Sequence, residues 1–228
     1  MTSGAAVGAV GVVVAAGGRG ERLGGSTPKA LRELAGEPLL VHAVRALRRA
    51  ASVGPIAVAA PADWVGRVEG CLGAFDVMVV EGGAQRHDSV AAALAALPGE
   101  VDLVLVHDAA RCLAPPELFE AVVAALRAGA EAVVPVLAVS DTVKRVAGDR
   151  VVETLDRSAL RAVQTPQGFR RDVLEQAHAV PVGEATDDAG LVERLGRTVT
   201  TVPGSPEAFK VTAPLDLLLA EAVLRGRA

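Results

Sequence analysis

The chain has 228 residues, of which 51% are hydrophobic and only 2% aromatic. Its length suits one large domain with a sizeable core. The scarcity of rings excludes proteins that stack single-stranded nucleic acid on aromatic side chains. The net charge of −4 gives no overall positive field for a nucleic-acid backbone. We therefore expect no nucleic-acid partner, and recognition of any phosphate group by local side chains and backbone amides.

The N-terminal segment and the two cysteines bear on the cellular compartment. Residues 2–18 carry no charge, but a signal peptide would begin with basic residues and a membrane span would be longer and less rich in glycine. Cys71 and Cys112 are 41 residues apart, which indicates neither a zinc site nor a disulfide framework. These features predict a cytoplasmic protein with no membrane segment.

Apolar runs alternate with amphipathic segments along the chain. Continuous apolar runs predict buried strands at 10–14, 56–60, 77–80 and 101–106, with further strands near 198–202 and 207–211. Helical periodicity predicts helices at 38–50, 63–72, from Asp88 or Ser89 to Leu97, and at 115–128, 170–179, 187–195 and 214–225. This alternation is typical of an α/β protein with a mostly parallel sheet, and we expect residues 1–228 to form a single domain.

A hairpin pattern at 140–160 interrupts this alternation. Two short runs, 142–146 and 151–155, flank a turn that contains Gly148. One interpretation is an inserted arm that packs on another subunit. The other is an ordinary antiparallel hairpin at the edge of the main sheet.

The stretch from Ala15 to Lys29 carries the clearest chemical signal. A glycine-rich turn directly after a predicted strand can bring backbone amides against phosphate oxygens. It is not a dinucleotide fingerprint, because Leu23 stands where the third glycine belongs, and no Gly-Lys-Ser/Thr of a Walker loop follows. Arg22 and Lys29, seven residues apart, could balance the charge that accumulates on a triphosphate as pyrophosphate departs.

Several segments resemble a known family. The glycine loop with Arg22, Pro28 and Lys29 resembles the signature of the sugar-phosphate nucleotidyltransferases. Four other segments resemble the 2-C-methyl-D-erythritol 4-phosphate cytidylyltransferases of the non-mevalonate isoprenoid pathway: 82–89, 106–111, 155–157 with 165–167, and 209–212. The resemblance implies a Rossmann-like nucleotidyltransferase domain with a protruding β-hairpin arm. It also implies transfer of CMP from CTP to methylerythritol phosphate, with release of pyrophosphate.

The resemblance further implies roles for individual residues. The catalytic set is Arg22 and Lys29, which stabilise the transition state, and Arg157 and Lys210, which hold the methylerythritol phosphate. The nucleotide-binding residues are Ala15, Ala16, Gly17, Gly18, Gly20, Gly83, Ala84 and Ser89. The substrate-binding residues are Asp108, Arg111, Thr142, Thr165 and Thr186. The cofactor is Mg²⁺, held through the CTP phosphates with Asp108 as a candidate ligand. A homodimer formed through the arm would bring Arg157 to the partner's site.

Structural interpretations compete at several of these positions. Asp108 follows a predicted strand, where aspartate often forms a turn or caps a helix. Ser89 and Thr186 each stand near the start of a predicted helix, where either could be an N-cap. Arg157 and Lys210, taken singly, could be solvated surface cations.

Three other functions remain open at this stage. The first is a cytidylyltransferase for another polyol phosphate, such as ribitol 5-phosphate. The second is a nicotinamide-dependent oxidoreductase, which Leu23 disfavours. The third is a nucleotide-binding module without catalytic activity.

Overall fold

A mixed sheet of eight strands forms the centre of the computed structural model, which describes residues 9–18, 27–180 and 186–227. Seven strands lie in the order β10-β7-β11-β6-β1-β4-β5, and β12 pairs with β7. Their bounds are β1 Ala9–Ala15, β4 Ile56–Ala60, β5 Met78–Glu81, β6 Val101–Asp108, β7 Ala132–Ala138, β10 Arg161–Val163, β11 Gln167–Arg170 and β12 Val199–Pro203. The strands predicted at 10–14, 56–60, 77–80, 101–106 and 198–202 are thereby confirmed.

Most of the sheet is parallel. Strand β1 pairs in parallel with β4 and β6, and β5 continues this direction beyond β4. Strand β11 is antiparallel to both β6 and β7, so β7 and its parallel partner β12 run in the direction of β6. The carboxyl ends of β1, β4, β5 and β6 therefore meet at one edge of the sheet, where open α/β sheets bind ligands.

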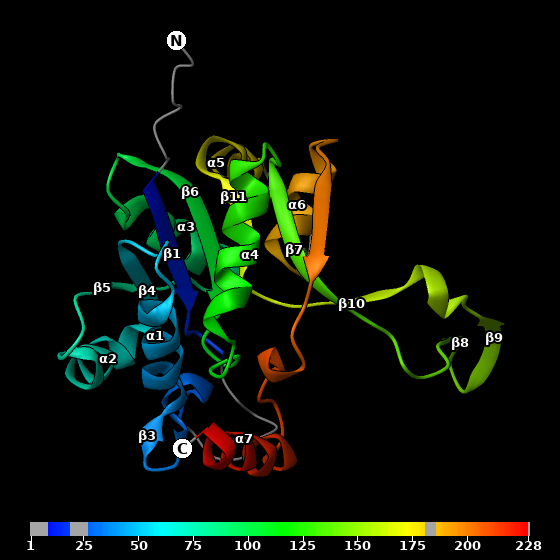
Figure 1. Cartoon of the computed structure of the whole chain (residues 1–228), viewed down its shortest axis with the longest axis horizontal. Coiled ribbons are helices and arrows are strands. Elements are labelled where there is room, and N and C mark those ends of the chain that lie inside the picture. Colours follow the sequence, from blue (N-terminus) through cyan, green and yellow to red (C-terminus); the bar gives the residue numbers. More distant parts are fainter. Residues whose placement is uncertain (1–8, 19–26, 181–185, 228) are drawn as a thin grey trace.

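Helices cover both faces of the sheet (Figure 1). Alternate residues of β1 serve the two faces: Val12 and Val14 pack with α1, α2 and α4, whereas Val13 packs with α3, α5 and α6. Continuous apolar runs therefore form the central strands, because both faces are buried. The helices are α1 Leu39–Arg49, α2 Val65–Leu72, α3 Arg86–Ala96, α4 Pro116–Arg127, α5 Arg171–Ala179, α6 Asp188–Arg194 and α7 Pro214–Arg227.

Helix α7 belongs to a smaller third cluster. Its Ala220 packs with Leu34, Cys112 and Val211 near the carboxyl edge of the sheet. Two short strands, β2 Glu33–Leu34 and β3 Glu37–Pro38, form a small separate sheet there. Short 3-10 turns complete the described chain: η2 Lys29–Leu31, η3 Ala62–Trp64, η4 Arg157–Ala159 and η5 Pro206–Ala208. No helix within the described ranges is long and apolar enough to cross a membrane.

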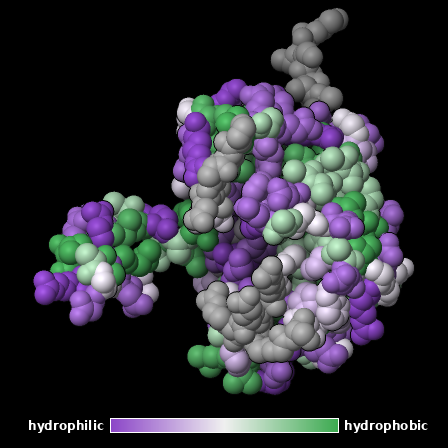
Figure 2. All heavy atoms as spheres, turned by 180° about the vertical axis from the view of Figure 1, so that it is seen from behind, coloured by the Kyte–Doolittle hydropathy of each residue, from purple (hydrophilic) through white to green (hydrophobic). Residues whose placement is uncertain are grey.

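The hairpin at 140–160 is an arm and not an edge of the main sheet. Its strands, β8 Lys144–Ala147 and β9 Arg150–Thr154, form a sheet of their own and project from the body of the molecule (Figure 1). Gly148 adopts a φ of 61° in the connecting turn, a conformation that glycine readily takes. Every residue of the two strands is exposed, including Val146, Val151 and Val152. Figure 2 shows these apolar side chains gathered on the arm.

The strand predicted at 207–211 is wrong. Residues 206–208 form η5 instead, because Ser205 accepts a hydrogen bond from Glu207 N and closes a turn before Phe209. Lys210 therefore lies on an irregular segment.

Three strands of the main sheet, β7, β10 and β11, were not predicted. Strand β7 contains Pro135, and β10 and β11 are short and partly polar. Proline is rare within a central strand, because it cannot donate to a neighbouring strand. The sequence pattern therefore does not indicate that β7 is a strand of the main sheet, or that β11 lies between β7 and β6.

Candidate active site

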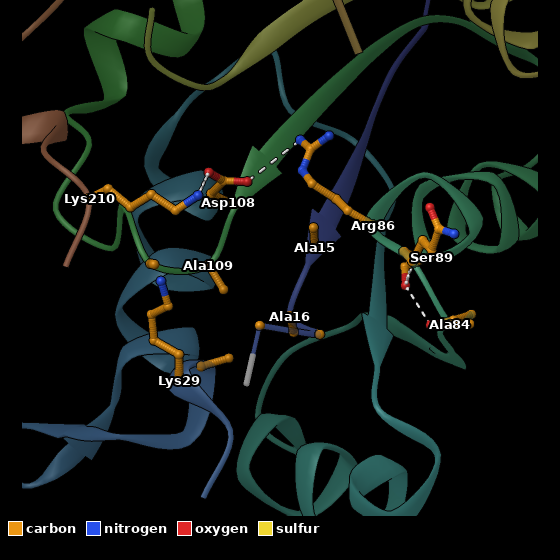
Figure 3. Close-up of a pocket in the computed structure, with 15 residues that line it drawn as sticks. Ala15, Ala16, Lys29, Ala84, Arg86, Ser89, Asp108, Ala109 and Lys210 are labelled. Carbon is orange, nitrogen blue, oxygen red and sulfur yellow. Dashed lines mark hydrogen bonds and ion pairs between the residues drawn. The ribbon is translucent and has the colours of Figure 1, made fainter. Parts of the chain in front are cut away.

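One pocket lies at the carboxyl edge of the parallel strands, and it unites segments that are distant in the sequence (Figure 3). The turn after β1 forms one wall, the segment between β5 and α3 forms another, and the end of β6 lies between them. Its lining is Ala15, Ala16, Gly17, Gly18, Lys29, Ala30, Gly83, Ala84, Gln85, Arg86, Ser89, Asp108, Ala109, Ala110 and Lys210. Most of these residues belong to the predicted site.

Lys29, the first residue of η2, lines the pocket beside the residues that follow β1. Its backbone N–H donates to the carbonyl of Gly18 at 2.9 Å, so these two residues lie next to each other. A Cβ at Gly18 would lie only 3.6 Å from Cε of Lys29, which shows that the lysine stem passes beside this glycine. The predicted residues Gly20 and Arg22 lie outside the described residues.

The segment before α3 is closely packed. A Cβ at Gly83 would lie 2.2 Å from Cβ of Asp88, so only glycine fits there. Helix α3 begins at Arg86, with Gln85 as its N-cap and a capping box between Gln85 and Asp88. The N-cap interpretation of Ser89 is therefore wrong, since Ser89 lies inside the helix. Its hydroxyl donates to the carbonyl of Gln85 at 3.1 Å and lines the pocket.

Asp108 is the last residue of β6 and is surrounded by cations. Lys210 Nζ lies 2.7 Å from its Oδ2, Arg86 Nη2 lies 3.6 Å from its Oδ1, and Arg111 Nε lies 3.9 Å from Oδ2. Figure 3 shows Lys210 and Arg86 reaching the carboxylate from opposite sides. Burial alone would raise the pKa of Asp108, but Lys210, Arg86 and Arg111 lower it to about 2. Asp108 is therefore an anion at neutral pH. Its role is not only to form a turn after β6, because its carboxylate faces three cations at the pocket.

Arg86 was not predicted as a site residue. It stands at the first position of α3, lines the pocket, and pairs with buried Asp188 at 2.6 Å as well as with Asp108. Burial would lower its pKa, whereas the charges of Asp188 and Asp108 raise it. The sequence signal was present, because Arg86 lies within the family-like segment 82–89, but the partner that reveals its role lies 102 residues away.

His107 and Thr165 support Asp108 from behind. The hydroxyl of Thr165 accepts a hydrogen bond from the backbone N–H of Asp108 at 3.0 Å and lies 3.2 Å from Nδ1 of His107. The imidazole is fully buried and meets the ring of Phe119 edge-on at 5.1 Å. Burial lowers the pKa of His107 to about 4, so the ring is neutral near pH 7. Thr165 is thus close to the site but does not line the pocket.

Arg111 and Thr186 also lie off the pocket. Arg111 donates to the carbonyls of Ala208 at 2.8 Å and Val163 at 3.3 Å. Thr186 is exposed, and its cap interpretation is wrong, because the side chain of Asp187 caps α6 by accepting from Gly190 N.

Thr142 and Arg157 lie at the two ends of the arm and are both exposed. The guanidinium of Arg157 donates to the carbonyl of Ser140. Neither residue lines the pocket of its own chain.

The pocket offers little for a metal ion by itself. Among the described residues no three His, Cys, Asp or Glu side chains gather as a metal site, and Asp108 is the only carboxylate that lines the pocket. Mg²⁺ often binds through one or two carboxylates and the phosphates of a substrate. The residues present therefore fit a cation held mainly by a nucleotide.

These features define a class of protein. A glycine-rich turn after the first parallel strand, lysines at the carboxyl edge and small residues along the opposite wall form a site for an anionic ligand with a flat group, such as a nucleotide. No pair of carboxylates or nucleophile with its base lines the described part of the pocket. The arrangement suits group transfer between phosphates, which relies on positioning and charge compensation, and so indicates a nucleotidyltransferase.

Comparison with known proteins gives the particular family. The family model for 2-C-methyl-D-erythritol 4-phosphate cytidylyltransferase matches residues 10–226. The cytidylyltransferase of that name from Frankia casuarinae is 60% identical over 94% of this chain and 81% of its own, and the one from Streptomyces avermitilis is 51% identical over 94% and 91%. The crystal structure of the Thermus thermophilus cytidylyltransferase superposes with a TM-score of 0.73 at 38% identity, covering 94% of this chain and 98% of that one. The chain belongs to the 2-C-methyl-D-erythritol 4-phosphate cytidylyltransferase family and is a nucleotidyltransferase.

Proposed function

We propose that this chain transfers the CMP group of CTP to 2-C-methyl-D-erythritol 4-phosphate, giving 4-diphosphocytidyl-2-C-methyl-D-erythritol and pyrophosphate. The observation that carries the proposal is the meeting of Lys29, Lys210 and Asp108 with the small residues of two distant segments in one pocket of a chain from this family. In the reaction an oxygen of the methylerythritol phosphate forms a bond to the α-phosphorus of CTP. The bond from that phosphorus to the β-phosphate breaks, and pyrophosphate leaves.

The residues of the pocket divide between the two substrates in this proposal. Lys29, with Arg22, lies on the CTP phosphates and stabilises the charge that builds up on pyrophosphate. The backbone at Gly83 and Ala84 and the hydroxyl of Ser89 read the cytosine edge, to which small residues allow close approach. No general base is needed, because the attacking phosphate is already an anion.

The second substrate occupies the side of the pocket nearest β6. Lys210 holds its phosphate, and Asp108 accepts hydrogen bonds from its hydroxyls. Thr165 and Arg111 do not line the pocket but contact Asp108 from behind it, and we assign them to the support of this side. A divalent cation, which we take to be Mg²⁺, would be held mainly by the CTP phosphates, and when bound it would supply positive charge to the phosphate oxygens.

The arm extends this proposal to a dimer. Its exposed valines at positions 146, 151 and 152 are apolar surface that a partner would bury. Arg157 and Thr142 lie at the base of the arm and away from their own pocket, so they serve the pocket of the second copy. We expect light scattering to give twice the mass of one chain.

A pyrophosphate-release assay tests the proposed function. CTP with methylerythritol phosphate should release pyrophosphate, whereas ATP, GTP or UTP with the same acceptor should release far less. Ribitol 5-phosphate is the matched acceptor, since it carries the same reacting group on a different chain. Equal or faster release with ribitol 5-phosphate would assign the chain to another polyol phosphate, and CTP binding without turnover would make it a binding module.

A further inference from the structure

A chain of polar side-chain contacts runs from the pocket into the protein. Arg86 Nη1 lies 2.6 Å from Oδ2 of Asp188, and the Oδ1 of Asp188 lies 3.1 Å from Nε2 of His178. The side chain of Asp188 is 1% exposed and that of His178 is 6% exposed, whereas that of Arg86 is 31% exposed. One end of the Arg86 guanidinium is therefore anchored inside the protein, while the other end faces Asp108 in the pocket.

The anchor is rigid because α6 is tied to the central sheet. Gln167 of β11 accepts from the backbone N–H of Ala189 at 3.1 Å and donates to Asp187 at 2.7 Å. Asp188 lies between these two contacts at the start of α6. Burying a carboxylate without a cationic partner costs free energy. Movement of Arg86 away from Asp188 is therefore unfavourable, and the ion pair holds Arg86 in place.

The two oxygens of Asp108 have different partners. Lys210 contacts Oδ2, and Arg86 faces Oδ1. In the proposed reaction Lys210 is the residue that must turn to a substrate phosphate. Arg86 cannot move to the phosphate in the same way, because it is paired with Asp188. The side chain of Asp188 is buried, so a substrate cannot displace it from Arg86.

We propose that Arg86 is a positioning residue, held by Asp188, that keeps the Asp108 carboxylate in place for the polyol substrate when Lys210 moves to the phosphate. The inference rests on the proposed function, because it assigns Asp108 to the polyol side of the pocket. Arg86 acts through Asp108, so its loss affects the polyol substrate more than CTP.

Steady-state kinetics with each substrate varied in turn test this inference. We expect Arg86→Gln and Asp188→Asn each to raise KM for methylerythritol phosphate by on the order of 10-fold, since the first removes the cation that faces Asp108 and the second removes the carboxylate that anchors that cation. The KM for CTP should change less than about threefold, a change too small to report the loss of a charge-assisted contact. Arg86→Lys keeps the charge but cannot bridge two carboxylates, so its KM for methylerythritol phosphate should fall between the values for wild type and Arg86→Gln.

The double variant Arg86→Gln/Asp188→Asn separates a relay from two independent effects. If Asp188 acts only through Arg86, the double variant should have the KM of Arg86→Gln alone. Arg197→Gln is the matched control, because Arg197 also bridges two acceptors, Glu131 and Gln176, but stands away from the pocket. It should leave both KM values unchanged.

Two kinetic results would overturn the inference. An equal rise in KM for CTP would show that Arg86 contacts the nucleotide directly, and an unchanged KM for methylerythritol phosphate would show that Asp108 needs no support. If Arg86→Gln does not fold, Arg86→Lys carries the same test with the same two contrary outcomes. Failure of the proposed function is distinct, because the wild-type protein would then release no pyrophosphate with methylerythritol phosphate.

Discussion

At the scale of single residues, the pocket is defined by cations that meet from distant parts of the chain. Lys29 comes from the start of η2, Arg86 from the start of α3 and Lys210 from the segment before α7. No local pattern relates Lys210 to Asp108, because they lie 102 positions apart and Lys210 belongs to no regular element. Family resemblance selected Lys210 from the sequence, whereas Arg86 emerged only from its ion pairs.

Lys29→Ala should lower kcat by on the order of 10²-fold, because it removes one donor that stabilises charge in the transition state. Pyrophosphate release under saturating CTP measures the effect. Arg225→Ala is the control, since Arg225 is an exposed cation of α7 that pairs with Glu221 and does not line the pocket. Near-normal turnover and unchanged CTP affinity in Lys29→Ala would contradict the assignment.

At the scale of elements, the start of α3 shows how packing restricts a binding wall. The predicted helix was correct in kind, but its first residue is Arg86 and not a residue after Asp88 or Ser89. The N-cap preferences of the amino acids favoured Asp88 or Ser89 as the cap, whereas in the structure Gln85 is the N-cap and forms a capping box with Asp88. This capping box depends on Gly83, because the absence of a side chain at Gly83 leaves room for Asp88.

Gly83→Ala should destabilise the protein by roughly 1–3 kcal/mol, because a Cβ there overlaps Asp88 and disturbs the capping box. Chemical denaturation measures the free energy of unfolding, and titration measures CTP binding, which should weaken as well. In Gly99→Ala, by contrast, the new Cβ meets nothing within 4 Å. Equal stability of the two variants would show that the backbone at Gly83 adjusts freely.

The junction of α5 and α6 gives a pH-dependent contribution to stability. Burial would raise the pKa of Asp188, but the hydrogen bond from His178 and the charge of Arg86 lower it overall. A carboxyl whose folded pKa lies below its unfolded value of about 3.9 contributes stability above that pH and loses it as the pH falls.

Asp188→Asn should therefore be less stable than wild type at neutral pH, and the difference should shrink as the pH falls below about 4. Urea denaturation at several pH values gives the two curves. Parallel curves would show that Asp188 does not titrate differently in the folded and unfolded states. The exposed pair Arg170–Asp172 provides the control variant Asp172→Asn, with little effect expected at any pH.

At the scale of the whole molecule, the sequence predicted the parallel half of the sheet better than the other half. Apolar runs identified β1, β4 and β6 because those strands are buried on both faces. Strand β11 carries the polar residues Gln167 and Arg170, and only its pairing between β6 and β7 shows that it is central. The arm was predicted as a hairpin, but its separation from the sheet depends on three-dimensional pairing.

Val151→Asp should shift the proposed dimer towards monomers, because it places a charge in apolar surface that a partner would bury. Sedimentation measures the mass, and pyrophosphate release should fall with it if Arg157 serves the partner's pocket. Val180→Asp is the control, because Val180 is 47% exposed but follows α5 away from the arm. A fully active monomer would contradict the exchange of Arg157.

The pairing of Lys210 with Asp108 also bears on how the pocket receives its ligand. The ammonium group of Lys210 already contacts the carboxylate of Asp108, and so it has lost part of its hydration shell before substrate binds. Arrival of a phosphate is then an exchange of one counterion for another. Part of the cost of removing water from the ammonium group is therefore met when the protein folds, before any substrate arrives.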